Sequence, residues 1–211
     1  MSKKQASFSL GLGLFDYINP IFYSITTITI FLNIKDKMPT PLFILFLIGM
    51  IISLIFGFSI PTVKCLVGLG KMKFEMPVNL VFYVNSGIFL SGISLFKYVS
   101  NINNTVYILI LIMAIMFLCF VLYKTKKFNT VAVLTGAVGY ILLYSSLITL
   151  SIQKQMMIPI TMYAIAILLF IFLCGIGIKA NLKNPKVHWV IEISNVICQG
   201  LVAIATVIQF H

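Results

Sequence analysis

The sequence predicts an all-α membrane protein with seven transmembrane helices and no soluble domain. Hydrophobic residues make up 61% of the 211 residues and charged residues only 9%, which excludes an ordinary soluble domain. A helix needs about 20 apolar residues to cross the hydrocarbon layer. Seven apolar runs meet this length, at residues 15–34, 41–60, 78–98, 105–123, 130–150, 157–178 and 187–210. We therefore interpret residues 1–211 as a single integral membrane domain of a multi-pass protein of the cell membrane.

The lysines predict how these helices are oriented. All fifteen basic residues are lysine, and four acids leave a net charge of +11. Because successive helices alternate in direction, eleven lysines fall on the side of the N-terminus and four on the other side. The positive-inside rule then places the N-terminus in the cytoplasm and His211 outside. The excess charge reflects topology, so we expect the lipid bilayer and no nucleic acid as a partner.

The first predicted helix has a line of polar residues on one face, and the second is followed by a connecting segment. Residues 15–34 lie too far into the chain for a removable signal peptide, so we expect a retained helix. Asp16, Asn19 and Tyr23 share one face of it, and Pro20 should kink it. Asp16 either belongs to a binding site or lies at the membrane interface. After the second helix, residues 61–77 are expected to form a connection with a basic segment that contains Lys71, Lys73 and Glu75, and this connection serves as a linker or a gate.

The last helix carries the most informative pattern. His188, Glu192, Asn195, Gln199 and Thr206 recur at spacings of four, three, four and seven, which keeps them on one helical face. Polar groups, and a carboxylate above all, are costly in hydrocarbon, so this face must look at protein or water. Glu192 is either protonated, paired with His188 one turn earlier, or solvated at the cytoplasmic end.

The two halves of the chain are weakly similar, which indicates an internal repeat. Residues 15–98 and 130–210 each form three helices, and residues 105–123 form a linker helix between them. A single linker helix makes the two copies parallel in the membrane. On this alignment Asn85 and Asn195 lie at similar depth in the third helix of each copy, where their amides either bind a substrate or only join neighbouring helices.

Other residue types restrict the chemistry. Tyr140 and Tyr144 share a face of the fifth helix and serve either as packing or as walls for a ligand ring. The chain has no arginine and no nucleophile or metalloprotease motif. Besides His188 it has one histidine, His211, which is expected at the opposite face of the membrane. We therefore expect no enzyme activity, no metal and no cofactor.

Seven short helices in a three-one-three arrangement, with Asn85 and Asn195 in equivalent helices, resemble the SWEET and PQ-loop superfamily of small transporters. The expected cytoplasmic N-terminus is more similar to its Pnu-type vitamin transporters than to its sugar facilitators. The resemblance implies two bundles that rock around a central site, with the asparagine pair lining it. The chain has Asn19-Pro20 where the family has a Pro-Gln pair, and Trp189 is its only tryptophan.

These observations predict a transporter or facilitator of one small polar molecule, a vitamin, sugar or amine, through a central site. The alternative is a non-transporting subunit or sensor that binds a partner protein through the polar face of the last helix. A homo-oligomer is compatible with either function. The predicted substrate-binding residues are Asn85, Asn195, Gln199, Glu192, Tyr140, Tyr144, Asp16, Asn19 and Tyr23.

Overall fold

The computed structural model describes residues 9–72, 78–179 and 185–211, and the regular structure within these ranges is helical. Seven helical segments in them are long and apolar enough to cross a membrane, as the sequence predicts. The helices are α1 Leu10–Asp16, α2 Ile18–Ile34, α3 Thr40–Gly68, α4 Val78–Ser100, α5 Asn104–Thr125, α6 Phe128–Gln153, α7 Met157–Lys179 and α8 Pro185–Phe210. Together α1 and α2 form the first span.

The first span begins earlier than predicted and is interrupted at Tyr17. It starts at Leu10, where the hydroxyl of Ser9 caps the helix. Pro20 has no N–H to donate to the carbonyl of Asp16, and its ring crowds that carbonyl, so the regular helix breaks there. The early start places Asp16 six residues inside the span, and its side chain is only 5% exposed.

The second span is longer than predicted, and the interpretation of residues 61–77 as a connection was wrong for its first part. Helix α3 continues through Pro61 to Gly68, so Lys64 lies inside a helix and is only 8% exposed. Membrane helices tolerate an internal proline because neighbouring groups satisfy the freed carbonyl. Residues 73–77 lie outside the described residues, so a gate at that place stays a prediction.

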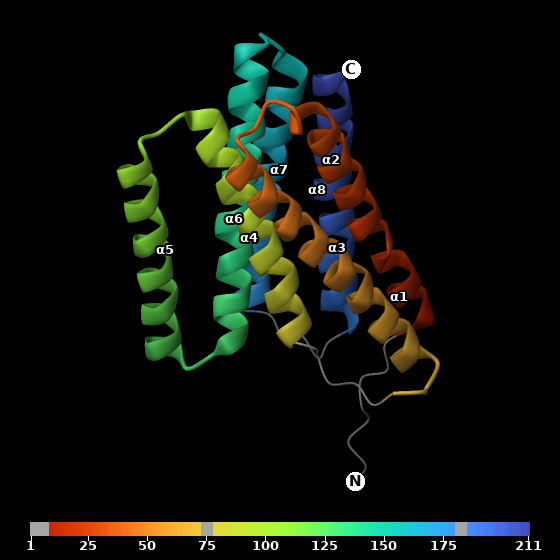
Figure 1. Cartoon of the computed structure of the whole chain (residues 1–211). Coiled ribbons are helices and arrows are strands. Elements are labelled where there is room, and N and C mark those ends of the chain that lie inside the picture. The colour runs from red at the N-terminus through yellow and green to blue at the C-terminus, as the bar shows by residue number, and fades with distance from the viewer. Residues whose placement is uncertain (1–8, 73–77, 180–184) are drawn as a thin grey trace.

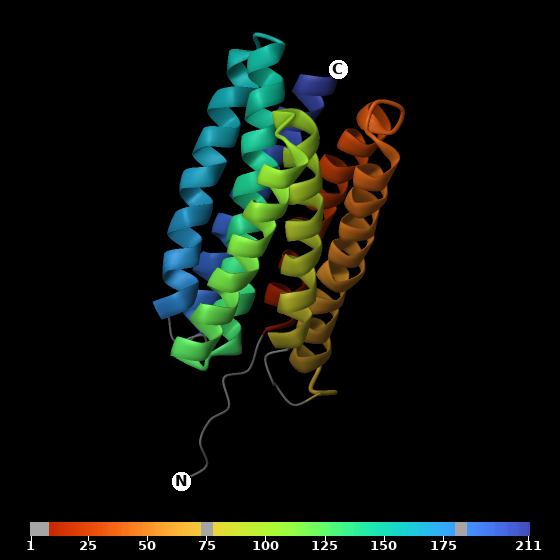
Figure 2. The same cartoon turned by 60° about the vertical axis from the view of Figure 1, so that its left-hand side comes forward.

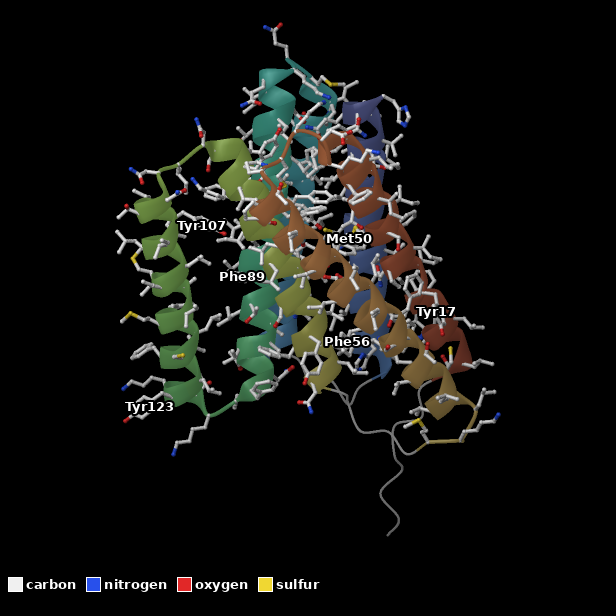
Figure 3. The ribbon with its side chains drawn as sticks, in the orientation of Figure 1. Tyr17, Met50, Phe56, Phe89, Tyr107 and Tyr123 are labelled. Carbon is white, nitrogen blue, oxygen red and sulfur yellow. The ribbon has the colours of Figure 1, made fainter. Side chains whose placement is uncertain are left out.

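Six spans form a closed ring, and the seventh stands outside it. Around the ring, α2 contacts α3, α3 contacts α4, α4 contacts α6, α6 contacts α7, α7 contacts α8, and α8 returns to α2. Figure 1 and Figure 2 show these helices side by side, with α5 on the outer surface. Helix α5 packs on α6 and has no buried residue, and Tyr107 and Tyr123 mark its two ends in Figure 3.

The ring is filled unevenly along its axis. We call the end at which α1, α4, α6 and α8 begin the N-terminal face, and the other end the C-terminal face. The half toward the C-terminal face is a solid core of fully buried apolar side chains. Among them are Ile30, Leu95, Leu143, Leu147 and Val202. The half toward the N-terminal face contains Asp16, Asn19, Asn85, Glu192 and Asn195, polar residues that the sequence marks as functional.

Candidate binding cavity

A cavity of about 270 Å³ lies inside the ring, and every span except α5 contributes to its wall. The lining extends from Asn129, the second residue of α6, to Gln199, halfway along α8. The cavity therefore reaches from the N-terminal face to the middle of the bundle. Eight of the nine predicted substrate-binding residues line it; they are Asp16, Asn19, Tyr23, Asn85, Tyr140, Glu192, Asn195 and Gln199.

Four of the lining residues are joined to one another by hydrogen bonds, and we call these four the charged cluster. They are Asp16, Asn19, Lys64 and Glu192. The Lys64 ammonium donates to Asp16 Oδ2 at 2.6 Å and to Glu192 Oε1 at 2.5 Å. The Asn19 amide donates to Asp16 Oδ1 at 3.0 Å and to Glu192 Oε2 at 3.1 Å. Each of the four carboxylate oxygens thus accepts one hydrogen bond within the cluster.

The local structure of three spans brings the charged cluster together. The break at Tyr17 separates α1, which carries Asp16, from α2, which carries Asn19. Helix α3 presents Lys64 one turn before it ends at Gly68. Helix α8 adds Glu192, seven residues or about 10 Å from its first residue. The charged cluster therefore joins the first three helices of the ring to the last one near the N-terminal face.

The charges of this cluster are costly to bury. Moving a carboxylate or an ammonium out of water costs several kcal/mol per ion even after relaxation, and the attraction between partners often only offsets that cost. Asp16, Lys64 and Glu192 are each less than 10% exposed. A buried ion pair is therefore weak evidence for stability, whereas ionisable residues within a membrane span mark functional sites by default.

The amide side chains of the cavity differ in their bonding. Asn85 donates to the carbonyl of Ala132 at 2.8 Å, so it joins α4 to α6 while also lining the cavity. Asn195 lines the cavity from α8 and is half-buried. Gln199 is 4% exposed, and its side-chain oxygen has no hydrogen-bond partner. The two asparagines therefore line the same cavity. Asn85 is the one of the two whose side chain also joins neighbouring helices.

Aromatic side chains form part of the wall. The ring centroids of Tyr140 and Phe170 lie 4.3 Å apart, and both residues line the cavity. Tyr23 donates to the hydroxyl of Ser53 and bonds that of Ser91, which ties α2, α3 and α4 together. Tyr144 packs behind Tyr140 at 5.4 Å and is not part of the lining. Of the two predicted stacking residues, Tyr140 alone reaches the cavity.

The polar face of the last helix is turned away from lipid, as the sequence predicts. His188, Glu192, Gln199 and Thr206 are all less than 10% exposed. Helix α8 presents apolar side chains on its outer face; these are Val190, Ile193, Ile197, Ile204 and Val207. Thr206 lies beyond the cavity, where it accepts a hydrogen bond from Tyr163. His188 lines the cavity.

Sequence reasoning missed Lys64. Its partner in α8 is 128 residues away, so no local pattern reveals the pair. One signal was present, because Lys64 is the single charge between Phe56 and Gly70 in an otherwise apolar stretch. Pro61 led to that stretch being interpreted as a loop. Lys64 and Asn19 bind the carboxylate of Glu192, and the sequence pattern named neither of them as its partner.

The donor set of the described residues does not fit a metal centre. No group of three or more histidine, cysteine, aspartate or glutamate side chains within these ranges could hold a metal ion. Comparison with protein-family models, with curated proteins and with solved structures finds no match for this chain. The functional conclusion therefore rests on the cavity and its residues.

Proposed function

We propose that this protein is a membrane transporter or facilitator of one small polar metabolite, which binds in the central cavity between two three-helix bundles. The proposal places it in the cell membrane with its N-terminal face toward the cytoplasm. The observation that carries it is the cavity of about 270 Å³, which is lined by helices from both halves of the chain. Small-molecule sites of proteins are concave, largely apolar and provided with a few convergent polar groups.

The helix order of the ring supports a two-bundle mechanism. The first bundle contains α1 to α4 and the second contains α6 to α8, with α5 between them in sequence and outside them in space. The bundles meet along α4 and α6 and again along α2 and α8, so each junction pairs the third helix of one bundle with the first of the other. Two parallel copies related by an axis along the membrane normal have this arrangement.

Hydrogen bonds lie both within the bundles and between them. Tyr23 joins helices within the first bundle, and Tyr163 joins α7 to α8 within the second through Thr206 and Gln209. Between the bundles, side chains join α4 to α6 through Asn85 and join α8 to α2 and α3 through Glu192. The proposed mechanism requires that these contacts between the bundles change, as they do in hinge and shear motions.

The alternative, a subunit or sensor that binds a partner through the polar face of the last helix, has less support. That face is covered by α2, α3 and α7 of the same chain, and its polar residues line the cavity or bond within the bundle. A partner helix would have to displace these contacts. Between Val190 and Ile208, the exposed side chains of α8 are all apolar.

The test is transport by purified protein in liposomes, with a variant that fills the cavity. Asn195→Trp places a large ring in the cavity, and Ile197→Trp places the same ring on the lipid side of α8, where Ile197 is 52% exposed. Radiolabelled sugars, vitamins, nucleosides and amines are offered under inward and outward gradients. We expect flux of at least one of them with the wild type and Ile197→Trp, and none with Asn195→Trp.

Two results count against the proposal. One is the absence of flux for every solute in vesicles that contain folded protein. The other is equal flux with both tryptophan variants, because an indole ring inside the cavity should block a solute that passes through it. Isolation of the native protein in a stoichiometric complex that dissociates with Glu192→Gln would favour the partner-binding alternative.

A further inference from the structure

The charged residues of the cavity indicate the charge of the molecule that it binds. Two carboxyl groups, Asp16 and Glu192, and one ammonium, Lys64, line the cavity, which leaves one net negative charge when both carboxyl groups are ionised and His188 is neutral. From this surplus we infer that the cavity binds a small organic cation, an amine or guanidinium in its charged form. Its N–H groups donate to Asp16 and Glu192 in the place that the Lys64 ammonium occupies in this structure. The inference rests on the proposed function, since it assigns a substrate class to the same site.

The unused hydrogen-bonding capacity of the cavity also favours a donor. Asn19 uses its amide nitrogen to bind both carboxylates, so the orientation of its amide is fixed, and its buried oxygen has no partner. The buried side-chain oxygen of Gln199 has no partner either. Carboxylate oxygens have two lone pairs each and accept further hydrogen bonds. The site therefore offers acceptors to a ligand, and an ammonium or guanidinium group consists entirely of donors.

Lys64 acts as a tethered cation at this site. Its ammonium is a compact charge on a flexible four-carbon stem, and its backbone lies one turn from the end of α3 near the N-terminal face. Long lysine stems reach toward the membrane surface and keep the charged group in water. When a ligand amine takes over the carboxylates, Lys64 can withdraw in that direction. The two carboxylates then face a cation both before and after binding, so they are never buried together without one.

The rest of the cavity limits the size and shape of the ligand. Its volume is just below the range of about 300–1,000 Å³ that is common for small-molecule sites. The faces of Tyr140 and Phe170 attract cations and pack against apolar groups. Gln199 lies seven residues beyond Glu192 on α8, or about 10 Å along the helix axis. The cavity thus fits a short amine with an apolar body and a second donor at its far end.

The test measures binding to the purified full chain in detergent by calorimetry. The amine probes are butylamine, putrescine, agmatine and tyramine. Butanediol and succinate, with the same four-carbon length as putrescine, are the neutral and the anionic controls. We expect at least one amine to bind and neither control to do so. Glu192→Gln keeps the shape of the site and removes its surplus charge, so we expect affinity to fall by about 30-fold or more.

Lys64→Gln provides the opposite change. It removes the internal competitor, so the folded variant should bind the same amine at least about tenfold more tightly than the wild type. Its unfolding temperature should also rise with amine concentration, because a ligand of the native state stabilises it by mass action. Lys124→Gln, a change of an exposed lysine outside the cavity, should leave binding unchanged.

Binding of butanediol or succinate in place of the amines, or amine binding that Glu192→Gln leaves intact, overturns the inference. So does the failure of all four amines. If Lys64→Gln does not fold, the wild type and Glu192→Gln still decide the result. Amine binding of the expected pattern without flux in liposomes supports the charged site and contradicts the transporter proposal. Flux of a neutral solute without amine binding supports the transporter proposal and contradicts the charged site.

Discussion

Each member of the charged cluster has two partners within it, and this is how three buried charges are accommodated at the level of single residues. Asp16 and Glu192 are both bridged by the same ammonium and the same amide. The removal of one partner leaves the others buried and uncompensated, whereas the neutralisation of all charges at once leaves nothing unpaired. The two kinds of change should therefore differ sharply in their effect on stability.

Lys64→Met tests this difference. It leaves Asp16 and Glu192 buried beside each other without a cation, so we expect the free energy of unfolding to fall by about 3–5 kcal/mol. Addition of Asp16→Asn and Glu192→Gln to the same chain should restore most of the loss. Denaturant unfolding in detergent micelles measures both variants. Equal stability of Lys64→Met and the wild type would show that water, and not Lys64, balances the two carboxylates.

Two buried tyrosines provide a second comparison between partnered and unpartnered groups. The hydroxyl of Tyr163 donates to Gln209 at 2.7 Å and bonds Thr206 at 3.0 Å, whereas the hydroxyl of Tyr144 has no partner. Tyr163→Phe should lower stability by about 1–3 kcal/mol, because it leaves buried acceptors unsatisfied. Tyr144→Phe should be neutral or stabilising. A larger loss for Tyr144→Phe in thermal unfolding would contradict this assignment.

At the level of elements, glycines decide which helices approach closely. A Cβ atom on Gly139 of α6 would lie 2.6 Å from the backbone nitrogen of Phe89 in α4, and one on Gly92 would lie 2.4 Å from the carbonyl oxygen of Gly139. Likewise, a Cβ on Gly49 of α3 would lie 2.5 Å from the carbonyl oxygen of Gly87. Small residues allow such backbone contacts in membranes, where close packing drives helix association. Helices α3, α4 and α6 therefore form the tight side of the ring.

Gly139→Ala should force α4 and α6 apart. The clash involves backbone atoms, which cannot turn away as a side chain can, so we expect a loss of about 1–3 kcal/mol. Gly175→Ala in α7 is the matched control, because a Cβ there meets nothing within 4 Å. Thermal unfolding should separate the two variants. A similar loss at both positions would point to helix flexibility rather than to the α4–α6 contact.

For the whole molecule, the uneven filling of the ring has a functional consequence. The core closes the half toward the C-terminal face, and the cavity occupies the half toward the N-terminal face. If the protein is a transporter, as proposed, its ligand should enter from the N-terminal face in this conformation. An alternating-access transporter must also adopt a second conformation in which the core half opens.

Cysteine labelling tests this one-sided access. Cys174 lines the cavity, so in a chain with Cys65, Cys119 and Cys198 changed to serine it should react with a membrane-impermeant thiol reagent from the N-terminal face only. Sealed vesicles of both orientations distinguish the two sides. As a control, Leu95→Cys in a cysteine-free chain should resist labelling from either side, because Leu95 is fully buried. Labelling of Cys174 from the C-terminal face alone would reverse the assigned opening.

Much of the site could be found from sequence because the hydrocarbon environment acts locally. A polar side chain within an apolar run must avoid lipid wherever the helix lies, and this reasoning identified Glu192, Gln199, Asn85 and Asn195. It could not distinguish residues that line the cavity from residues that only pack behind its wall. Tyr144 shares a helical face with Tyr140 but lies behind it. It also misplaced Lys64, since a lysine near a span end is usually a loop residue and only a distant carboxylate makes its burial tolerable.

The sequence by itself determined the fold class, the seven spans and the inward direction of the polar face of α8, because each depends on the transfer of a single segment from water into hydrocarbon. Only the tertiary structure decided that Asp16, Lys64 and Glu192 form one cluster and that the cavity occupies one half of the ring. It also decided that α5 stands outside the ring. The charged cluster depends on contacts between the first, second and last spans, whose residues are 48 to 173 positions apart. The close approach of helices depends on glycines whose effect is visible only once two backbones are in contact.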